Sequence, residues 1–457
     1  MWNYTFPEKL DKPRYLYIAD RLEDDIISGE LAPRARLMTH RELAAETGVT
    51  AATINKAYRE VERRGLIKMQ VGRGTFVLEN KCPAGNARDC RDGIIDLGAT
   101  MPLQGTDPSV DPILMRIVHE GNSDALINCY MPLGLAIHRE TGSNWLRQNG
   151  IDATADSVLI ANGQQHALSS IISGLFRIGD RVAVAQYTNP GLKMLLQRSA
   201  IEMEGVAMDD DGMIPEHLDE LCKSKKINGL FVAENTHNPS ARLTSEERRK
   251  ALCEVVDKHK LLLFEDGSFN WIAMGKNRPF SSLLPDSSVY YACLGPSIYS
   301  GLRVAFIHAP QKLHTGIAQA IMENLWTVSP LAVAIACEVI TDGTLAKAAK
   351  NKSKEIARRI KVFRDVLAPY SLTCSEDSIY AWLFLPESQD ARDFERQAEK
   401  NGVRILSADR FIVGSFSAPN CVRLSVTGPK DIPSLKRGLD ILAGMLKSDS
   451  SLITPIW

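Results

Sequence analysis

The sequence has no apolar run that approaches the length of a transmembrane helix, which needs about 20 consecutive apolar residues. The segment over residues 1–15 also lacks the apolar core of a secretory signal peptide. Both absences predict a cytoplasmic protein with no membrane partner.

Cysteine pairs at metal-binding or redox spacing are absent as well. The nine cysteines are scattered from Cys82 to Cys421, and no two of them stand in a CxxC pattern. No cluster of histidine and cysteine has the spacing of a zinc site. We therefore expect reduced thiols and no metal site.

The chain also lacks a charge excess of either sign. Its 457 residues carry 54 Lys and Arg against 55 Asp and Glu, a net charge of -1. Nothing in the overall charge points to nucleic acid, so any DNA-binding surface must be a local patch. The length predicts two or three domains, and a hydrophobic content of 44% suits a globular protein with a sizeable core.

What is present begins with three helical patterns and a hairpin. Apolar residues recur at helical spacing over residues 15–28, and a capping box, Thr39 with Glu42, opens a second helix. A third helix is expected over about residues 50–64, after a tight glycine turn. Two short apolar strands then flank a Gly-Arg-Gly turn. This order predicts a winged helix-turn-helix domain over residues 1–79.

Basic side chains concentrate in this first domain. Between residues 34 and 73 there are nine Lys and Arg but only four Glu. Such an excess of positive charge suits binding to a phosphate backbone. The alternative is that these residues simply form a solvated face with no ligand. In a helix-turn-helix, the N-terminal end of the recognition helix enters the major groove.

The segments LAPRARL, RELAAETGVTAATINKAYREVERRGLI and GRGTFV, at their spacing here, resemble the GntR family of bacterial regulators. Thr50, Thr53 and Asn55 lie near the start of the third helix and can hydrogen-bond bases or phosphates. The resemblance adds Arg41 and the wing residue Arg73. These five residues are the predicted contacts to double-stranded DNA.

The rest of the chain reads as a linker and a second domain. Residues 80–94 carry Pro, Gly and charge without periodicity, which predicts a linker. Over residues 95–447 strand and helix patterns alternate, which predicts an α/β domain with a mostly parallel sheet and helices on both faces. A small α+β subdomain is expected over about 345–447, and a tail over 448–457. The expected strands of the large sheet are 157–160, 181–184, 229–232, 261–264, 289–291 and 304–307.

Short polar motifs follow several of these strands. Gly163, Gln164 and Gln165 form a turn into a helix, where backbone N–H groups can hold an anion. Taken alone, this motif could equally be an ordinary strand-to-helix turn. The segments HNPS, with Asn238, and FEDGS, with Asp266, lie after two later strands.

Together with Arg303 in the segment Gly-Leu-Arg, these motifs resemble the pyridoxal phosphate (PLP) site of fold-type-I aminotransferases. The resemblance is closest to the MocR regulators, in which a GntR head is fused to that fold. It implies that Gly163, Gln164, Gln165 and Arg303 hold a phosphate, although Arg303 could instead make a surface salt bridge. The same resemblance gives Asn238 the pyridine hydroxyl, and Asp266 the pyridine nitrogen. The predicted fold class is therefore a winged helix-turn-helix plus a fold-type-I PLP-transferase-like domain.

Three positions depart from the family's pattern. Pro296 stands seven residues before Arg303, where the family has the lysine that forms a Schiff base with PLP. Asn189 takes the place of a ring-stacking aromatic residue, which Tyr187 could replace, and Ser268 takes the place of a tyrosine. Because proline has no amine, we expect a pseudoenzyme without catalytic residues or covalent cofactor.

Arg423 matches the arginine that grips a substrate carboxylate in these aminotransferases. A planar guanidinium suits a carboxylate because it can donate two parallel hydrogen bonds. Alternatively, this arginine is kept for pairing inside the protein. We list it with Asn189 and Ser268 among the predicted ligand-binding residues.

Two functions are consistent with these features. The first is a sequence-specific transcription regulator, a head-to-tail homodimer whose inactive aminotransferase-like domain senses a small anionic metabolite. The metabolite could be PLP bound without a covalent bond or, as the altered contacts favour, another amino or carboxylic acid. The alternative is a PLP-dependent aminotransferase that carries a DNA-binding head.

Overall fold

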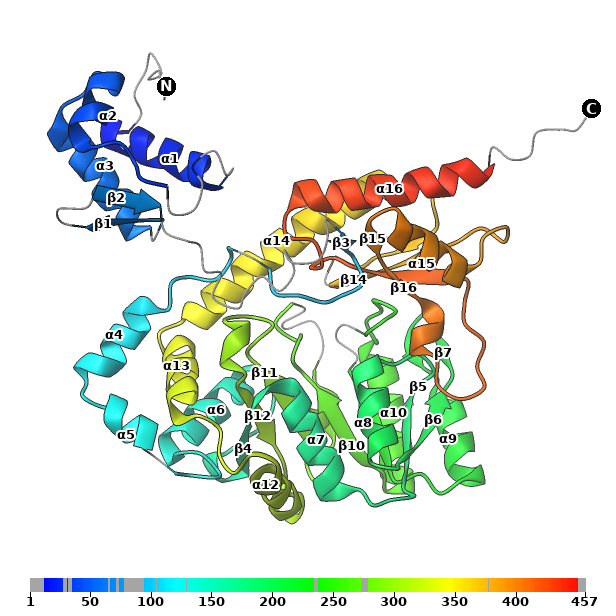
Figure 1. Ribbon diagram of the computed structural model, residues 1–457. Helices are drawn as coiled ribbons and strands as arrows, with labels where there is room; N and C mark the ends of the chain where they lie inside the picture. The colour runs from blue at the N-terminus through cyan, green and yellow to red at the C-terminus, as the bar shows by residue number, and fades with distance from the viewer. Residues whose placement is uncertain are drawn as a thin grey trace, which may run out of the picture. The chain divides into compact units, whose positions relative to one another are not determined.

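The computed structural model describes residues 12–27, 31, 35–64, 66–70, 74–77, 94–103, 105–128, 130–233, 237–272, 278–376 and 378–450. The chain divides into two compact units, Met1–Gly93 and Ile94–Trp457 (Figure 1). Within the described residues, none of the helices combines the length and apolar character needed to cross a bilayer.

The first unit is the predicted head of three helices and a hairpin. The capping box at the start of the second helix is confirmed, because Glu42 accepts from the Thr39 N–H and Thr39 accepts from the Glu42 N–H. Gly48 ends this helix at a φ of 65°, a left-handed conformation that glycine adopts without strain. The elements are α1 (Arg14–Ile27), α2 (His40–Thr47), α3 (Ala51–Arg63), β1 (Ile67–Gln70) and β2 (Gly74–Val77).

The core of the head forms where the apolar stripes of the three helices meet the hairpin. In α3, the buried residues Ile54, Ala57, Tyr58 and Val61 recur at helical spacing. The Tyr58 hydroxyl donates to the Met38 carbonyl at 2.7 Å, so its one polar atom is satisfied inside the core.

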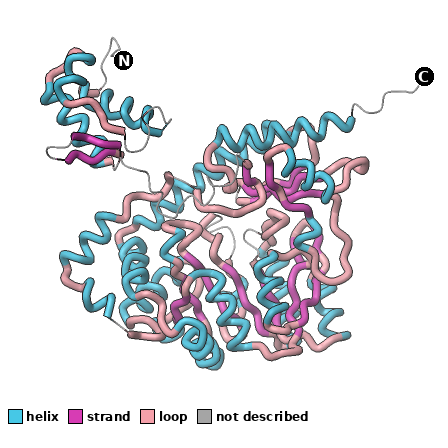
Figure 2. The backbone as a smooth tube through the Cα atoms, viewed as in Figure 1, coloured by secondary structure: helices cyan, strands magenta, loops and turns pink. Residues whose placement is uncertain are grey.

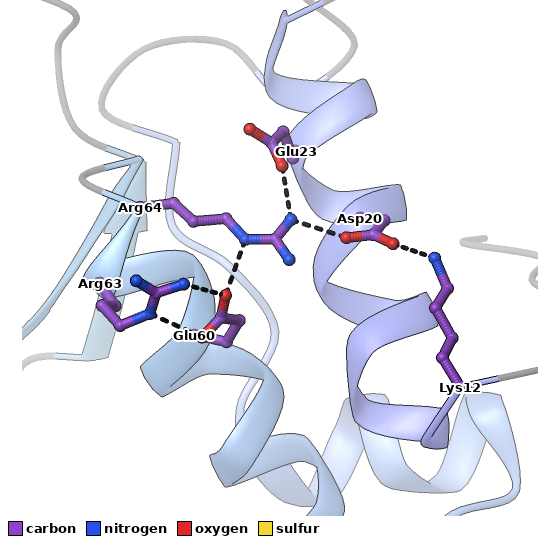
Figure 3. Close-up of polar contacts among 6 residues, drawn as sticks. All are labelled: Lys12, Asp20, Glu23, Glu60, Arg63 and Arg64. Atoms are coloured by element: carbon purple, nitrogen blue, oxygen red, sulfur yellow. Dashed lines mark hydrogen bonds and ion pairs between the residues drawn. The ribbon is translucent and has the colours of Figure 1, made fainter. Parts of the chain in front are cut away.

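An ion-pair cluster joins α1 to the end of α3 (Figure 3). The Arg64 guanidinium lies 2.7 Å from Asp20 and 2.5 Å from Glu23, both in α1, and 3.1 Å from Glu60 in α3. Hydrogen bonds from Arg63 and Arg64 lower the pKa of the Glu60 carboxyl to about 2. Arg64 is therefore held inside the head, and it is not one of the basic residues available to a phosphate.

The second unit is built on a seven-stranded sheet in which β12 runs opposite to the other six strands. The fold class predicted from the alternating patterns is confirmed. Each expected strand of this sheet is present within two residues of its predicted ends, whereas β6 was not predicted. The order is β4 (Val158–Ala161), β12 (Ala305–His308), β11 (Ser288–Cys293), β10 (Leu262–Asp266), β9 (Gly229–Val232), β5 (Arg181–Ala185) and β6 (Glu202–Val206).

Helices cover both faces of the sheet, so its strands form one layer between them (Figure 2). Strands β4 and β9 carry no polar side chain and are buried at every residue, as expected for strands covered on both faces. One face packs against α7 (Gly163–Leu175), α8 (Pro190–Arg198) and α12 (Gln311–Leu325). The other packs against α6 (Ala136–Gln148), α13 (Pro330–Thr341), α9 (Pro215–Ser224), α10 (Glu246–His259) and α11 (Phe280–Leu283). Next to α13 lie α4 (Asp111–His119) and α5 (Ser123–Asn128), and β7 (Met208–Asp209) pairs with β8 (Gly212–Met213).

A smaller domain follows, and the long helix α14 (Thr344–Leu367) leads into it and packs against α16 (Ile432–Ser450) (Figure 1). Because α16 continues to Ser450, the helix extends into the predicted tail. The small sheet has the order β13 (Leu372–Thr373), β14 (Tyr380–Phe384), β17 (Cys421–Ser425) and β16 (Leu406–Ser407). Beside it, β3 (Ile95–Asp96) pairs with β15 (Val403–Arg404), and α15 (Ala391–Lys400) packs on β15.

Replacing Arg64 with alanine should destabilise the head, because it leaves the three carboxylates of the cluster without their shared cation. We expect a loss of about 1–2 kcal/mol in the local unfolding free energy. Hydrogen exchange in peptides from α1 and α3 of the full-length protein would measure it. The control is Arg59→Ala, an exposed residue of α3, the helix that Arg64 follows directly. Equal exchange in the two variants would contradict a structural role for Arg64.

Candidate functional site

The start of α3 presents polar side chains at the surface of the head. Thr50 is the N-cap: its hydroxyl accepts from the Thr53 N–H at 3.3 Å and lies 3.0 Å from the Thr53 hydroxyl. Thr50 is exposed, and Thr53 and Asn55 are half-buried. Arg41 is exposed in the first turn of α2. The structure therefore places four of the five predicted DNA contacts at the starts of α2 and α3, whereas Arg73 lies outside the described residues.

Two further basic residues extend this surface along α3. Lys56 and Arg59 are exposed, and among the described residues neither has an acidic partner. They stand on the same face as Ala52, since 52, 56 and 59 follow helical spacing. The predicted site omitted both, although the excess of positive charge in the sequence included them.

The second unit contains a cavity of about 290 Å³ at the carboxyl edge of the large sheet, next to the small domain. Ligands bind at this edge in open α/β sheets. Polar residues that follow β4, β5 and β9 line it, as does the last residue of β10. The loop before β12 and residues of α14 and β14 complete the lining. The predicted residues that line it are Gln164, Gln165, Asn189, Asn238, Asp266 and Arg303. Pro296 lines the same cavity.

Arg303 is held against the first residue of α7. In the antiparallel ladder of β4 and β12, Ala161 pairs with Ala305, so the continuing strands bring Gly163 opposite Arg303. A Cβ on Gly163 would lie 2.9 Å from the guanidinium, and the φ of Gly163 is 76°. Arg303 is exposed without an acidic partner among the described residues. The cation and the N-terminus of α7, which has no side-chain cap, are both groups that attract an anion.

Asp266 ends β10 and faces the cavity from the sheet. It accepts hydrogen bonds from the Gln164 side-chain amide and, at 2.9 Å, from the Ser268 N–H. Burial raises the pKa of the Asp266 carboxyl against these hydrogen bonds, which lower it. A cationic donor in the cavity would favour the ionised carboxylate.

Asn238 and Arg423 contact each other at the side of the cavity. The Arg423 guanidinium donates to the Asn238 side-chain oxygen at 2.8 Å and to the Gly98 carbonyl. It is stacked between the rings of Tyr380 and Phe411, each 4.9 Å away. Because its oxygen is occupied, Asn238 can offer its amide N–H groups to a ligand. Arg423 is itself buried and does not line the cavity. Its contacts match the alternative interpretation, in which this arginine pairs inside the protein.

The residues at and near the positions that differ from the aminotransferase pattern make local structural contacts. Asn189 caps α8, since its side-chain oxygen accepts from the Leu192 N–H at 2.9 Å. Tyr187 packs edge-on against Trp382 at 5.2 Å, and it does not line the cavity. Ser268 is buried behind the wall, where its hydroxyl accepts from the Cys293 N–H.

Comparison with known proteins agrees with this division into two parts. The family described as bacterial regulatory proteins of the gntR family matches residues 14–77. The family described as aminotransferase class I and II matches residues 127–435. The chain belongs to the MocR-type regulators.

Relatives that match nearly the whole of this MocR-type chain are found in bacteria. An uncharacterised HTH-type transcriptional regulator, YdeF, of Bacillus subtilis (strain 168) is 30% identical over 96% of either chain. A similarly named protein, YjiR, of Escherichia coli (strain K12) is 22% identical over 91% of this chain and 95% of its own. An archaeal alanine:glyoxylate aminotransferase shares the fold, with a TM-score of 0.71 at 22% identity, over 87% of this chain and 95% of its own.

Aminotransferase folds normally bind PLP, and the cavity of this MocR chain meets only part of what that cofactor needs. Arg303 with Gly163 suits its phosphate, and Asp266 suits its ring nitrogen. Pro296 provides no amine, and Asn189, engaged in capping α8, provides no ring for stacking. The residues therefore fit a phosphate-bearing ring held without a covalent bond at position 296.

A Gly163→Ala substitution should weaken anion binding, because the new Cβ would displace the Arg303 guanidinium and sit at an unfavourable φ. We expect affinity for pyridoxamine 5′-phosphate to fall at least tenfold, about 1.4 kcal/mol, by titration calorimetry. Gly301→Ala is the matched control, since no atom lies within 4 Å of its added Cβ. Unchanged affinity in Gly163→Ala would contradict the assigned anion site.

Proposed function

We propose that this protein is a DNA-binding transcription regulator whose aminotransferase-like domain is a catalytically inactive sensor of a small anionic metabolite. The observation that carries the proposal is the pairing of an intact winged-helix head with a cavity that keeps Arg303 and Asp266 but has proline at position 296. Because DNA is the target, we place its action in the cytoplasm.

The head would read DNA with the start of α3 in the major groove. Thr50, Thr53 and Asn55 can contact bases, and Arg41, Lys56 and Arg59 can contact phosphates. Arg73 remains a predicted contact in the wing. Supporting this assignment, the other basic residues at the end of α3, Arg63 and Arg64, are paired with acids.

The sensor cavity would take an amino or carboxylic acid, or a compound related to PLP held noncovalently. Ligand binding shifts a conformational equilibrium only if the ligand contacts the two states differently. The cavity lies between the large sheet and the long helix α14 of the small domain, so a ligand there can bias their arrangement.

We further propose a homodimer with paired large domains, arranged head to tail as in the family. Large apolar side chains are exposed on α4, α5 and α6, between α5 and α6, and at the end of α12. Isolated monomers rarely expose such a set. The exposed apolar residues are Met115, Val118, Ile127, Tyr130, Met131, Ile137, Met322 and Trp326. Within this set, the rings of Tyr130 and Trp326 meet edge-on, with centroids 6.1 Å apart.

The dimer can be tested by light scattering. A monomeric mass at micromolar concentration would contradict it.

Substituting both Lys56 and Arg59 with alanine should weaken DNA binding. Sites selected from a random pool by the wild-type protein would be titrated at several salt concentrations by fluorescence anisotropy. Removing two phosphate contacts should reduce the slope of log affinity against log salt by about two. The matched control, Lys354→Ala with Arg358→Ala, removes exposed residues of α14. Absence of selective, salt-dependent binding by the wild-type protein would refute the proposed function.

Introducing a lysine by Pro296→Lys tests the interpretation of this position. With one equivalent of PLP, followed by borohydride, peptide mass spectrometry should find no stoichiometric adduct in the wild-type protein, whereas the variant should carry one per chain at residue 296. The physical reason is that the variant supplies the amine that position 296 lacks. An adduct on the wild-type protein, with turnover of an amino donor that Asp266→Ala abolishes, would favour the aminotransferase alternative.

A further inference from the structure

One charged residue of the cavity wall belongs to none of the motifs that resemble aminotransferases. Lys352 projects from α14 and is only 1% exposed. It lines the cavity together with Ile356, one helical turn further on. Its side-chain nitrogen lies 2.7 Å from an Asp107 side-chain oxygen.

The ion pair leaves much of the lysine's hydrogen-bonding capacity unused. Neither Lys352 Nζ nor Asp107 Oδ1 makes a hydrogen bond of good geometry with any described residue, although the two atoms are close. An ammonium group has three N–H donors, and a buried donor without an acceptor is costly. The other Asp107 oxygen accepts from the Tyr299 N–H at 3.2 Å. Lys352 is thus a buried ammonium group that faces the cavity and, apart from its ion pair with Asp107, has no acceptor among the described residues.

The remaining charges of the cavity show where a second anion can bind. Asp266 is occupied by Gln164 and the Ser268 N–H, and Arg303 faces the first anion site at α7. Arg423, the residue expected to hold a carboxylate, does not line the cavity and is engaged with Asn238. Among the described lining residues, Lys352 is the other cation.

We infer that the ligand carries two anionic groups, and that Lys352 binds the second one, a carboxylate. The inference rests on the proposed function, in which the cavity binds an anionic metabolite. One anionic group lies at Arg303 and the start of α7. The carboxylate replaces Asp107 as the partner of Lys352 Nζ and accepts hydrogen bonds from the N–H donors that are otherwise unused.

Two probe pairs test this inference, each with and without a carboxylate. They are N-(5′-phosphopyridoxyl)-L-alanine against pyridoxamine 5′-phosphate, and 3-phosphonopropionate against ethylphosphonate. Calorimetry on the full-length protein would compare wild type, Lys352→Met, Asp107→Asn and Arg423→Gln. The double variant Asp107→Asn with Lys352→Met removes both charges, so it covers the case in which Lys352→Met alone fails to fold.

In at least one pair, the wild-type protein should bind the carboxylate-bearing probe about tenfold or more tightly. Lys352→Met and the double variant should lose that preference while binding the other probe within about threefold of wild type. Asp107→Asn should retain or increase the preference, because Lys352 then has no competing acid. Arg423→Gln should retain it.

Several outcomes would overturn the inference: no binding of any probe, no preference in the wild-type protein, a preference that survives in Lys352→Met, or one lost only in Arg423→Gln. DNA binding would be measured on the same samples. If DNA binding is intact and any of these outcomes is found, only the role of Lys352 is rejected, and the proposed regulator function stands. A wild-type protein that fails to bind DNA would reject the proposed regulator function, whatever the probes show.

Discussion

The guanidinium of Arg303 packs against Gly163 with a gap that a single Cβ would close. This contact follows from the pairing of β4 with β12, because the register that joins Ala161 to Ala305 brings the two residues together beyond the strand ends. The start of α7 and a cation then meet at the carboxyl edge of the sheet. The ends of β5, β9 and β10 reach the same edge, so Asn189, Asn238 and Asp266 converge on one cavity.

Within that geometry, a change of a few side chains alters the chemistry without disturbing the scaffold. Pro296 and Asn189 remove an amine and a stacking ring, yet the sheet, its helices and the anion site persist. The polar groups that remain are arranged for recognition: Asp266 is held by Gln164, and Asn238 is oriented by Arg423. A site of this kind can orient and bind a ligand, and position 296 offers it no amine for covalent attachment.

Local signals in the sequence predicted much of this structure. The capping box at Thr39 and the apolar stripe of α3 depend on neighbours a few residues apart, so they can be recognised without tertiary information. The strands of the large sheet are short apolar runs between helical patterns, and they were placed correctly. The exception is β6, an edge strand that pairs only with β5. Two glutamates and a glycine among its five residues give it none of the apolar pattern by which the other strands were recognised.

Tertiary contacts decided the parts of the site that sequence could not predict. Arg423 matches a family motif, but its burial between two rings and against Asn238 depends on residues far away in the chain. Lys352 belongs to a basic amphipathic helix and looks like a surface residue until α14 is packed against the segment that carries Asp107. The ion pairs of Arg64 likewise join α1 to α3 and separate this arginine from the exposed Lys56 and Arg59.

The most direct test of a ligand cavity without covalent attachment is a crystal structure of the full-length protein purified without added ligand. The account predicts electron density for a bound anion at Arg303 and Gly163, extending toward Lys352 and separate from every lysine side chain. Continuous density between a lysine and the bound molecule, or a cavity that holds only solvent, would contradict it.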